Sequence, residues 1–390
     1  MATVEITNGV VHGIDAEEVT IGRGVQIGQR TQICAKSVFL GDGVAIDDDV
    51  TIAGDKLRIG AGTHIGANVR VLSPTIEFGE RCRIGSGLRA ELNEHFVLGR
   101  LAEVGHSVRI VGQGLRAGDH FWLTDMVVIG GGGARGPRSY LVVGDRSAVM
   151  ERCYINLSDT VTIGTDTALS NGVTILTHSM WQPTLDGGSS QFAPVQIGSR
   201  CILYVNAIVA PGVTIGDDVT VAAGALVIQK VPDGATAIGN PARVMRATPP
   251  VPRDVGAARR DAIVRETLRD WTSTLAIKGV RADYAEESGA VTATFGGITD
   301  LVWYAAQGGP ASRPGAVTIS LAFGAAPAGA AAQCHFDLSA RTASGTLSPL
   351  AEDLRDFLRR RTIRIYSDRP FRPLPAANLE RLRARLRSPQ

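Results

Sequence analysis

Aliphatic residues recur at every sixth position in one stretch of the chain: Ile197, Leu203, Val209, Ile215, Val221 and Val227. An α-helix, with about 3.6 residues per turn, does not produce this spacing, and neither does an ordinary strand, whose side chains alternate between two faces. Three steps of six close a triangular coil of about 18 residues, in which each aliphatic residue stacks on its counterpart one coil away. The spacing therefore predicts a parallel β-solenoid.

The same spacing recurs in four shorter blocks: Ile21, Ile27 and Ile33; Leu40, Ile46 and Ile52; Ile59, Ile65 and Val71; and Ile163, Leu169 and Ile175. Glycine often follows the aliphatic residue, as at Gly60 and Gly216, and we expect the corner between two flat faces to need unusual backbone angles there. A β-sandwich, with turns about every eight to twelve residues, would not keep a strict six-residue phase across separate blocks.

The repeat is clean over residues 19–72 and returns over 143–231. Between these blocks, residues 88–142 keep only fragments of the phase, so we expect an irregular segment joining two blocks that are either continuous or separate. The glycine-rich stretch 130–136 lies in this segment and lacks the Gly-Lys-Ser/Thr ending of a phosphate-binding P-loop. We interpret it as a flexible loop.

The chain divides on this basis into N-terminal β-helix coils over residues 1–107 and a second β-helix block over 108–246. The proline-rich stretch 247–253 can continue neither coil nor helix and predicts a linker to a second domain at 254–390. Helical spacing and short apolar runs predict a small α+β domain there, with helices at 263–275, 350–358 and 376–386 and strands at 291–295, 301–304, 317–323 and 363–366.

Composition excludes several classes of function. The 390 residues carry a formal net charge of +2, which argues against a general nucleic-acid-binding protein. No apolar run long enough for a membrane span and no signal-like N-terminus is found. The five cysteines show no CxxC spacing and favour reduced thiols in a cytoplasmic protein. We expect Cys34, Cys82 and Cys201 to be small apolar fillers within the coils.

One long insertion interrupts the C-terminal repeat between Ile175 and Ile197, over residues 177–194. An insertion of this length in a rigid repeat usually carries function. His178 lies at its root, where a neutral imidazole can take a proton from a hydroxyl group. The alternative is a structural histidine that caps the loop.

Five stretches of the second block carry a family resemblance: Val161-Thr-Ile-Gly-Thr-Asp166, Asn171-Gly-Val-Thr-Ile-Leu-Thr-His178, Ala210-Pro-Gly-Val-Thr-Ile-Gly-Asp-Asp218, Val221-Ala-Ala-Gly-Ala225 and Gly239-Asn-Pro-Ala-Arg-Val-Met-Arg246. They resemble the hexapeptide-repeat acyltransferases, which are left-handed β-helix enzymes, most closely the maltose, galactoside and polysaccharide O-acetyltransferase branch. The resemblance implies that 108–246 is the catalytic block, that His178 is the general base and that the protein is a homotrimer.

The resemblance also implies acetyl-CoA as the acyl donor and no metal. Val205 matches the family position whose backbone amide faces the thioester carbonyl, where a donor stabilises the developing oxyanion. Ala223 lies 18 residues later, one full coil away, so that the two amides stack along the axis. The other residues that we expect to bind the cofactor are Gly224, Lys230, Ile238, Gly239, Pro241, Arg243 and Arg246.

The acceptor side departs from the family pattern. An asparagine of the sugar acetyltransferases aligns here with Met150, and a lysine that often precedes Lys230 is Gln229. Candidate acceptor contacts are Asn156, Trp181, which could stack on a sugar ring, and Asp186.

The sequence thus predicts an acetyl-CoA-dependent O-acetyltransferase acting on a hydroxyl of a sugar or glycosylated metabolite by direct attack. Transfer to an amino sugar or transfer of a longer acyl group is the alternative within the family. Outside it, the alternatives are a non-catalytic scaffold and a zinc enzyme like the γ-class carbonic anhydrases. That class needs paired histidines, whereas the other solenoid histidines are scattered, at His64, His95, His106 and His120.

Overall fold

The computed structural model describes residues 2–3, 6–7, 10–11, 13–132, 136–246, 254–306, 319–325 and 332–387. Contacts divide the chain into two compact units, residues 1–253 and 254–390, and each is described by itself. The predicted linker 247–253 and the middle of the glycine-rich stretch, 133–135, lie outside the described residues. Within the described ranges no helix is both long and apolar enough to cross a membrane.

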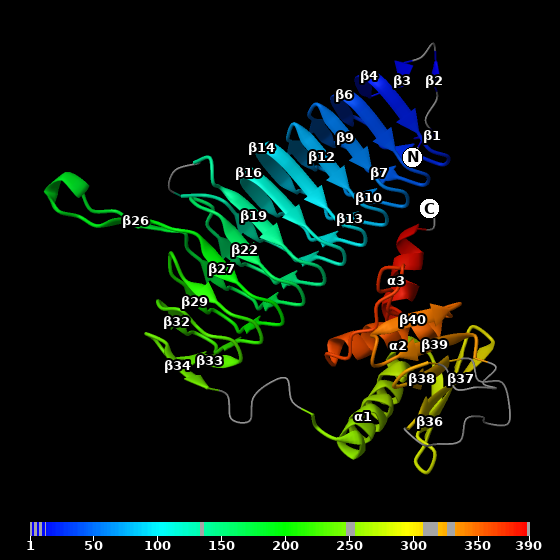
Figure 1. Ribbon diagram of the computed structural model, residues 1–390. Helices are drawn as coiled ribbons and strands as arrows, with labels where there is room; N and C mark the ends of the chain where they lie inside the picture. The colour runs from blue at the N-terminus through cyan, green and yellow to red at the C-terminus, as the bar shows by residue number, and fades with distance from the viewer. Residues whose placement is uncertain are drawn as a thin grey trace. The chain divides into compact units, whose positions relative to one another are not determined.

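The first unit is a parallel β-solenoid, as predicted, built from stacked three-sided coils (Figure 1). One face is a 13-stranded sheet, in the order β1 (Ala2–Thr3), β5 (Gln26–Ile27), β7 (Ala45–Ile46), β10 (His64–Ile65), β13 (Arg83–Ile84), β15 (Glu103–Val104), β17 (Trp122–Leu123), β20 (Ala148–Val149), β23 (Ala168–Leu169), β28 (Ile202–Leu203), β31 (Thr220–Val221), β33 (Ala235–Ile238) and β34 (Arg243–Arg246). The β1 and β34 pairings at its two ends are antiparallel.

The other two faces form one 17-stranded sheet, because several long strands continue around the corner between them. Its strands are β4 (Ile14–Ile21), β6 (Gln32–Leu40), β8 (Thr51–Ala53), β9 (Lys56–Ile59), β11 (Arg70–Leu72), β12 (Thr75–Phe78), β14 (Arg89–Leu98), β16 (Arg109–Ala117), β18 (Val128–Ile129), β19 (Tyr140–Val143), β21 (Tyr154–Ile155), β22 (Val161–Ile163), β24 (Thr174–Ile175), β27 (Val195–Ile197), β29 (Ile208–Val209), β30 (Thr214–Ile215) and β32 (Leu226–Val227). Two hairpins lie outside these sheets: β2 (Ile6–Thr7) with β3 (Val10–Val11), and β25 (His178–Met180) with β26 (Ser190–Phe192).

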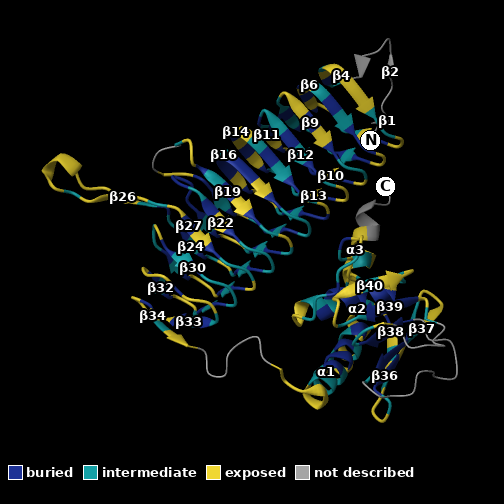
Figure 2. Ribbon diagram, in the orientation of Figure 1, coloured by how far each residue is buried: buried dark blue, intermediate teal, exposed yellow. Residues whose placement is uncertain are grey.

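Among the described residues the solenoid is continuous, and most of the segment 88–142, which we expected to be irregular, forms regular coil. Strands β13, β15, β17 and β20 pair in parallel without interruption through this region. The irregularities are local: the β14–β16 register shifts between Leu92 and His95, and a longer connection separates β18 from β19. The core of buried, mostly aliphatic residues runs from Ile14 to Ala242, and buried positions recur along the stacked coils (Figure 2).

Coil length differs between the two ends of the rod. Near the N-terminus Ile27 pairs with Ile46 and Ile46 with Ile65, which gives 19 residues per coil instead of the expected 18. Near the C-terminus Leu203 pairs with Val221, which restores 18. The additional residue of the N-terminal coils lies in the corner bridged by strands such as β6, and it explains why the six-residue phase restarts in separate blocks.

The glycines that follow the aliphatic residues allow neighbouring coils to pack closely. Our expectation of unusual backbone angles at these glycines is wrong. Neither Gly60 nor Gly216 adopts the left-handed conformation. A Cβ atom on Gly60 would lie 2.5 Å from the backbone nitrogen of Glu80 in the next coil. The left-handed conformation occurs two residues later, at Gly62 and Asp218.

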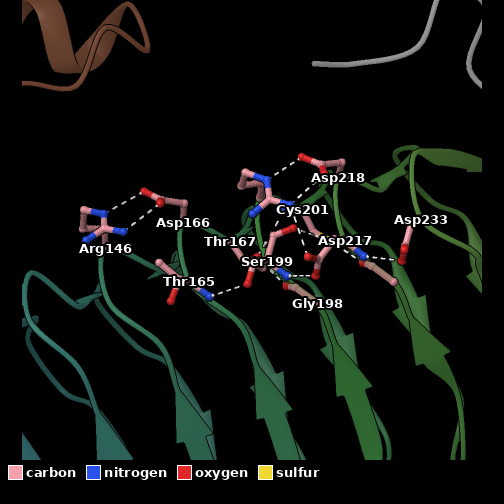
Figure 3. A network of polar contacts seen from close by, with 12 residues as sticks. Arg146, Thr165, Asp166, Thr167, Gly198, Ser199, Cys201, Asp217, Asp218 and Asp233 are labelled. Carbon is pink, nitrogen blue, oxygen red and sulfur yellow. Dashed lines mark hydrogen bonds and ion pairs between the residues drawn. The ribbon is translucent and has the colours of Figure 1, made fainter. Parts of the chain in front are cut away.

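At the corner where the chain passes from the 17-stranded sheet into the 13-stranded sheet, side chains cap backbone amides of the preceding coil (Figure 3). The Ser199 amide donates to Asp217 Oδ1 over 2.8 Å, and the Asp217 amide donates to Asp233 Oδ1 over 2.9 Å. Arg200 pairs with Asp218 in the same row, at 2.7 Å. Each acceptor satisfies an amide that the turn leaves without a strand partner.

The second unit is an α+β domain with one six-stranded sheet in chain order, β35 (Arg281–Ala285), β36 (Ala290–Phe295), β37 (Ile298–Ala305), β38 (Ile319–Ala322), β39 (Cys334–Asp337) and β40 (Thr342–Gly345). The central three strands are parallel and the outer pairings are antiparallel. Its helices are α1 (Ala257–Leu275), α2 (Pro349–Arg360) and α3 (Ala377–Arg387), with a short 3-10 turn, η2 (Ala276–Lys278).

The three predicted helices are present in this domain, and so are the strands predicted at 291–295 and 301–304. The strand predicted at 317–323 corresponds to β38, although residues 317–318 lie outside the described part. The strand predicted at 363–366 is wrong, because this segment makes only a single bridge, between Tyr366 and Thr342. The core joins α1 and α2 to one face of the sheet, where Trp271 donates to Asp353 over 2.9 Å.

All five cysteines lie in described parts of the chain and are free thiols. Cys82, Cys153 and Cys201 are buried in the solenoid, as a filler role requires, whereas Cys34 is exposed. Cys34 departs from our expectation because it falls on an outward-facing position of β6, between the buried Ile33 and Ala35. Burial raises the pKa of the Cys82 and Cys153 thiols to about 11.

Candidate active site

The insertion over residues 177–194 forms a hairpin that projects from the solenoid (Figure 1). Strands β25 and β26 pair antiparallel, with His178 opposite Phe192, and a 3-10 turn, η1 (Thr184–Asp186), lies near the tip. His178 is therefore the first residue of the hairpin that leaves the coil. Its imidazole is half-buried, whereas the rest of β25 is exposed.

Asn156 holds this imidazole from the coil below. The two residues are joined by Asn156 Oδ1 and His178 Nδ1, which lie 2.8 Å apart. Asn156 is fully buried, and the same Oδ1 accepts a hydrogen bond from the Thr177 hydroxyl over 2.6 Å. Ser158 Oγ lies 3.2 Å from His178 Nδ1 as a second contact. The His178 imidazole is thus anchored to the rigid coil, even though this residue begins a projecting hairpin.

Backbone carbonyls of the glycine-rich stretch fix the orientation of the Asn156 amide. Its Nδ2 donates to the carbonyl oxygens of Gly131 and Gly132. Carbonyl oxygens can only accept, so the amide nitrogen must face them and Oδ1 must face the histidine. Gly131 and Gly132, which we expected to be part of a flexible loop, have φ angles of 71° and 64° and belong to this network.

The tautomer of His178 follows from these contacts. Since Asn156 Oδ1 can only accept, Nδ1 of the imidazole must carry the hydrogen. The Ser158 hydroxyl donates to the Gly132 carbonyl over 3.1 Å, which leaves its oxygen as a second acceptor for Nδ1–H. In the neutral ring Nε2 then holds the free lone pair. No described residue donates a hydrogen bond to that nitrogen.

Phe192 and Gly132 also lie beside the imidazole ring. The Phe192 and His178 rings stack with centroids 5.9 Å apart and planes inclined by 20°. A Cβ atom on Gly132 would lie 3.3 Å from His178 Cε1, so this glycine passes close to the ring edge. Sequence reasoning found His178 but missed its surroundings, Thr177, Ser158, Phe192 and the glycine carbonyls, because they come from three different coils.

Val205 and Ala223 occupy equivalent turns of neighbouring coils, as the sequence indicated. Leu203 pairs with Val221 in the sheet, and the Gly224 amide donates to the Val205 carbonyl over 2.9 Å. At the same corner of earlier coils, side chains cap the corresponding amides: Gln29 donates to Asp48 Oδ1, and His106 donates to Asp125 Oδ1.

No such cap is possible at Val205, because the residue one coil above it, Ala223, has no acceptor in its side chain. In the described part of the chain, neither amide donates a hydrogen bond to another residue. Both residues are exposed. The last coils therefore present two outward-facing donors in line along the solenoid axis.

The remaining residues expected to bind a cofactor lie at the C-terminal end of the same face. Strand β33 stacks on β31, which places Gly239 above Ala223 at the same corner. Strand β34 folds back antiparallel on β33, with Arg243 opposite Ile238. All of these residues are exposed: Gly224, Lys230, Ile238, Gly239, Pro241, Arg243 and Arg246.

One chain does not bring His178 and Val205 together. His178 follows the carboxyl end of β24, whereas Val205 precedes the amino end of β29. These two strands are parallel neighbours, so the residues lie at two different corners of the solenoid, one face apart.

The three candidate acceptor contacts are also separated. Asn156 is buried, with its polar atoms bound to neighbouring residues, so it orients His178 and presents no polar atom to solvent. Trp181 is 97% exposed and Asp186 is exposed, both on the projecting hairpin. Among the described residues no group of three or more histidine, cysteine or acidic side chains could hold a metal ion.

Residues 194–229 match the family model described as bacterial transferase hexapeptide (six repeats). The chain is similar to “Putative acetyltransferase YvoF” of Bacillus subtilis (strain 168), at 36% identity over 98 residues, which covers 25% of this chain and 54% of that protein. It is also similar to the galactoside O-acetyltransferase of Escherichia coli (strain K12), at 33% identity over 89 residues, which covers 22% and 44% respectively. Residues 194–229 thus carry hexapeptide repeats of the bacterial transferase type, and the chain is similar to acetyltransferases that contain them. The chain spans about half the length of these curated relatives.

Two solved structures resemble the hexapeptide-repeat solenoid. The Arabidopsis UDP-N-acetylglucosamine acyltransferase is 19% identical with a TM-score of 0.43, over 66% of this chain and 80% of that one. A maltose O-acetyltransferase from Clostridium difficile 630 is 23% identical with a TM-score of 0.28, over 39% and 69%.

Proposed function

We propose that this hexapeptide-repeat protein transfers an acetyl group from acetyl-CoA to a hydroxyl group of a sugar or glycosylated metabolite, with His178 as the general base. The observation that carries the proposal is the contact between His178 Nδ1 and Asn156 Oδ1, at 2.8 Å. It holds the neutral ring in the tautomer whose Nε2 can accept a proton.

The reaction is a direct attack. His178 Nε2 removes the proton of the acceptor hydroxyl as its oxygen attacks the thioester carbonyl, and the carbon–sulfur bond breaks to release the thiol. The imidazolium returns the proton to the departing sulfur. Meanwhile the Val205 amide faces the oxygen on which negative charge develops, an interaction commonly worth about 3 kcal/mol. No covalent enzyme intermediate is required.

Exposed groups at the C-terminal coils suit acetyl-CoA as the donor. The stacked Val205 and Ala223 amides would line its pantetheine arm, and Gly224 continues the same turn. Ile238, Gly239 and Pro241 would pack beside the adenine, while Lys230, Arg243 and Arg246 would meet its phosphates. The galactoside O-acetyltransferase relative supports acetyl transfer to a carbohydrate hydroxyl.

A homotrimer completes the proposed site. Because His178 and Val205 lie at different corners of one chain, they can face the same substrate only if corners of two copies adjoin. The hairpin supports this assembly, since Trp181 and Leu185 are 97% and 100% exposed and are available to lie on a second copy. In that arrangement Trp181 and Asp186 would approach a neighbouring acceptor site.

The test is product analysis with a library of sugars and nucleotide sugars, acetyl-CoA and the purified chain, followed by mass spectrometry. We expect one acetylated product, and a loss of about 10²- to 10⁴-fold in rate for His178→Ala. His64→Ala is the matched control, because His64 is an exposed solenoid histidine paired with Asp47 at 3.1 Å and should leave the rate unchanged. Full activity of His178→Ala would contradict the role of His178 as general base. Failure of the wild type to bind CoA would favour a non-catalytic scaffold protein.

A further inference from the structure

An open groove of about 530 Å³ lies on the N-terminal coils, apart from the residues proposed to bind acetyl-CoA. Equivalent corner segments of three successive coils form it: residues 53–55, 72–74 and 91–93. The strands β8, β11 and β14 lead into these segments in parallel register, with Ala53, Leu72 and Glu91 side by side. The lining combines apolar side chains with exposed polar ones, among them Asp55 and Asn93. Such a lining suits a ligand that has both apolar and polar surface.

The groove follows the corner from which His178 projects. Arg89 and Thr174 occupy the same row, because β14, β16, β18, β21 and β24 pair in register one after another. Asn93 lies four residues after Arg89, just as His178 lies four residues after Thr174, so both lie at this corner. Four strand steps of about 4.8 Å separate the two coils, which places the near end of the groove roughly 19 Å along the axis from the proposed base.

Two rings lie at this corner between the groove and the coil of His178. Glu94, which follows the groove residue Asn93, accepts a hydrogen bond from the Tyr140 hydroxyl over 2.6 Å. The His95 ring stacks on Tyr140 with centroids 5.9 Å apart. A Cβ atom on Gly114 would lie 2.5 Å from His95 Cε1, so this glycine, in the coil between the two rings, makes room for the stack. Aromatic rings at a surface offer an apolar wall against which a sugar ring can pack.

Arg138 continues the corner from these rings to the proposed base. Its Nη2 donates to Asp159 Oδ2 over 2.6 Å, and its Nε donates to Oδ1 over 3.2 Å. Asp159 is buried, whereas the Arg138 side chain is 71% exposed. Ser158, the neighbour of Asp159, contacts His178 Nδ1. A guanidinium group has five donor hydrogens, so three remain for a ligand that approaches His178 along this corner.

Three exposed arginines in register border the groove: Arg70 on β11, Arg89 on β14 and Arg109 on β16. Side chains two residues apart on a strand point to the same side, so this row runs beside the groove positions Leu72 and Glu91. In the part of the chain that the structure describes, none of the three arginines makes an ion pair or a hydrogen bond through its side chain. Like charges on neighbouring strands repel each other, and an anionic ligand would relieve this repulsion.

The acids at the groove do not balance this arginine row. Asp55 pairs with Lys36, at 2.8 Å. Among the described residues at the groove, the other carboxylates are Glu91 in the lining and Glu94 beside it. Three arginines thus outnumber two carboxylates, so the local charge is positive and favours an anionic ligand.

We propose that this corner binds an acidic oligosaccharide, a chain of sugar units that carry carboxylates, as the acceptor of the proposed transfer. The unit to be acetylated lies at His178, and units further along the chain lie in the groove. The arginines follow one another at the strand spacing of about 4.8 Å, which is close to the advance of one sugar ring in an extended chain. The carboxylates therefore match the arginine row, and the ring hydroxyls match Asn93 and Glu91. The role of the chain as acceptor rests on the proposed function, whereas its binding does not.

Isothermal titration calorimetry of the full-length chain, without acetyl-CoA, tests the binding with a β-1,4-linked mannuronate octamer. This probe is an extended chain with one carboxylate on each ring. Its comparisons are the mannuronate monomer and the octamer with its carboxylates methyl-esterified. We expect the free octamer to bind at least about tenfold more tightly than either, because a hydrogen bond to a charged group is worth about one such factor or more. Arg89→Gln and Asn93→Ala should each weaken octamer binding several-fold.

Arg30→Gln is the control variant, because Arg30 is also an exposed arginine of the N-terminal coils but pairs with Asp49 at another corner, at 2.6 Å. It removes the same charge and should leave octamer binding unchanged. The proposal is overturned if the octamer binds no more tightly than the monomer or the methyl ester. It is equally overturned if Arg89→Gln weakens binding no more than Arg30→Gln does.

Acetyl transfer distinguishes the failure of this site from the failure of the proposed function. With acetyl-CoA we expect a KM at least about tenfold lower for the octamer than for the monomer, and Arg89→Gln should raise only the KM of the octamer. Acetylation of the monomer together with no preference for the octamer would overturn the groove and leave the transferase function standing. Tight octamer binding without any acetyl transfer would overturn the transferase function, and with it the acceptor role of the chain.

Discussion

His178 Nδ1 lies 2.8 Å from Asn156 Oδ1, and this contact joins the inserted hairpin to the coil beneath it. The Asn156 amide is in turn fixed by the carbonyls of Gly131 and Gly132. Three coils thus cooperate to orient one imidazole. The tautomer of the neutral ring, with the hydrogen on Nδ1, follows from this chain of contacts and from no single residue.

We expect Asn156→Ala to reduce kcat by about 10- to 100-fold, less than His178→Ala, because the imidazole keeps its chemistry but loses its main orienting partner. KM for acetyl-CoA should change little, since Asn156 lies at a different corner from the Val205 and Ala223 amides. Steady-state kinetics separate the two parameters. Tyr154→Phe is the matched control, because the Tyr154 hydroxyl binds the same Gly131 carbonyl, at 2.9 Å, without touching the histidine. Equal losses in the two variants would assign Asn156 a purely structural role.

The row of side-chain caps suggests a substitution that removes the proposed oxyanion donor without touching Val205 itself. In Ala223→Asp the new carboxylate should cap the Val205 amide, just as Asp125 caps the His106 amide over 2.7 Å at the same corner. We expect a loss of about 10²- to 10³-fold in kcat, the usual cost of one oxyanion donor. Ala223→Val, which adds bulk but no acceptor, is the control. If both variants lose only affinity for acetyl-CoA, the Val205 amide is not the oxyanion donor.

Much of the solenoid could be predicted from the six-residue phase. The part that was missed is the part where small residues hide this phase. Within residues 88–142, alanine occupies two inward positions, Ala90 and Ala117, and both are buried in the core. Alanine is too small to mark the aliphatic phase in the sequence. The phase itself continues through Leu98, Val104 and Ile110, which a search tolerant of alanine would have found.

The site was less predictable than the fold. The loop position marked His178, but its partner Asn156 precedes it by 22 residues and is brought close only by coil stacking. The corner glycines were recognised, yet their reason was missed, because contacts between coils are not visible in a local sequence pattern. The free amide of Val205, by contrast, can be predicted from the sequence once the alignment of coils is known, because the Ala223 side chain has no acceptor.

Glycines of the corners should respond differently to alanine according to what surrounds them. Gly60→Ala would place a Cβ atom 2.5 Å from backbone atoms of Gly79 and Glu80, so we expect it to cost about 1–3 kcal/mol or more. The Cβ atom of Gly43→Ala would meet no atom within 4 Å. The only cost to stability is the left-handed φ of 66°, about 1 kcal/mol. Thermal unfolding should therefore show the larger fall in Tm for Gly60→Ala. The reverse order would contradict the packing explanation.

Thiol labelling should distinguish Cys34 from the other cysteines. At about pH 8 an exposed thiol reacts readily, whereas Cys82 and Cys153, with pKa values of about 11, hold almost no thiolate and are shielded. We expect one rapidly modified cysteine per native chain, located at Cys34 by peptide mass spectrometry, and five after denaturation. Cys34→Ser should abolish the rapid reaction, and rapid labelling of Cys82 in the native protein would show that the coils open.

Complementation between inactive copies tests whether His178 and Val205 act across a subunit boundary. A chain with His178→Ala keeps its Val205 amide, and a chain with Ala223→Asp keeps its base, so each lacks one half of the site. If the two halves come from adjoining copies, mixed assemblies formed by refolding or co-expression contain some sites with both halves intact. Such mixtures should therefore regain a substantial fraction of wild-type activity, while each variant alone stays inactive. A double variant mixed with wild type controls for dilution, and mixtures that remain inactive would place both groups in the site of a single chain.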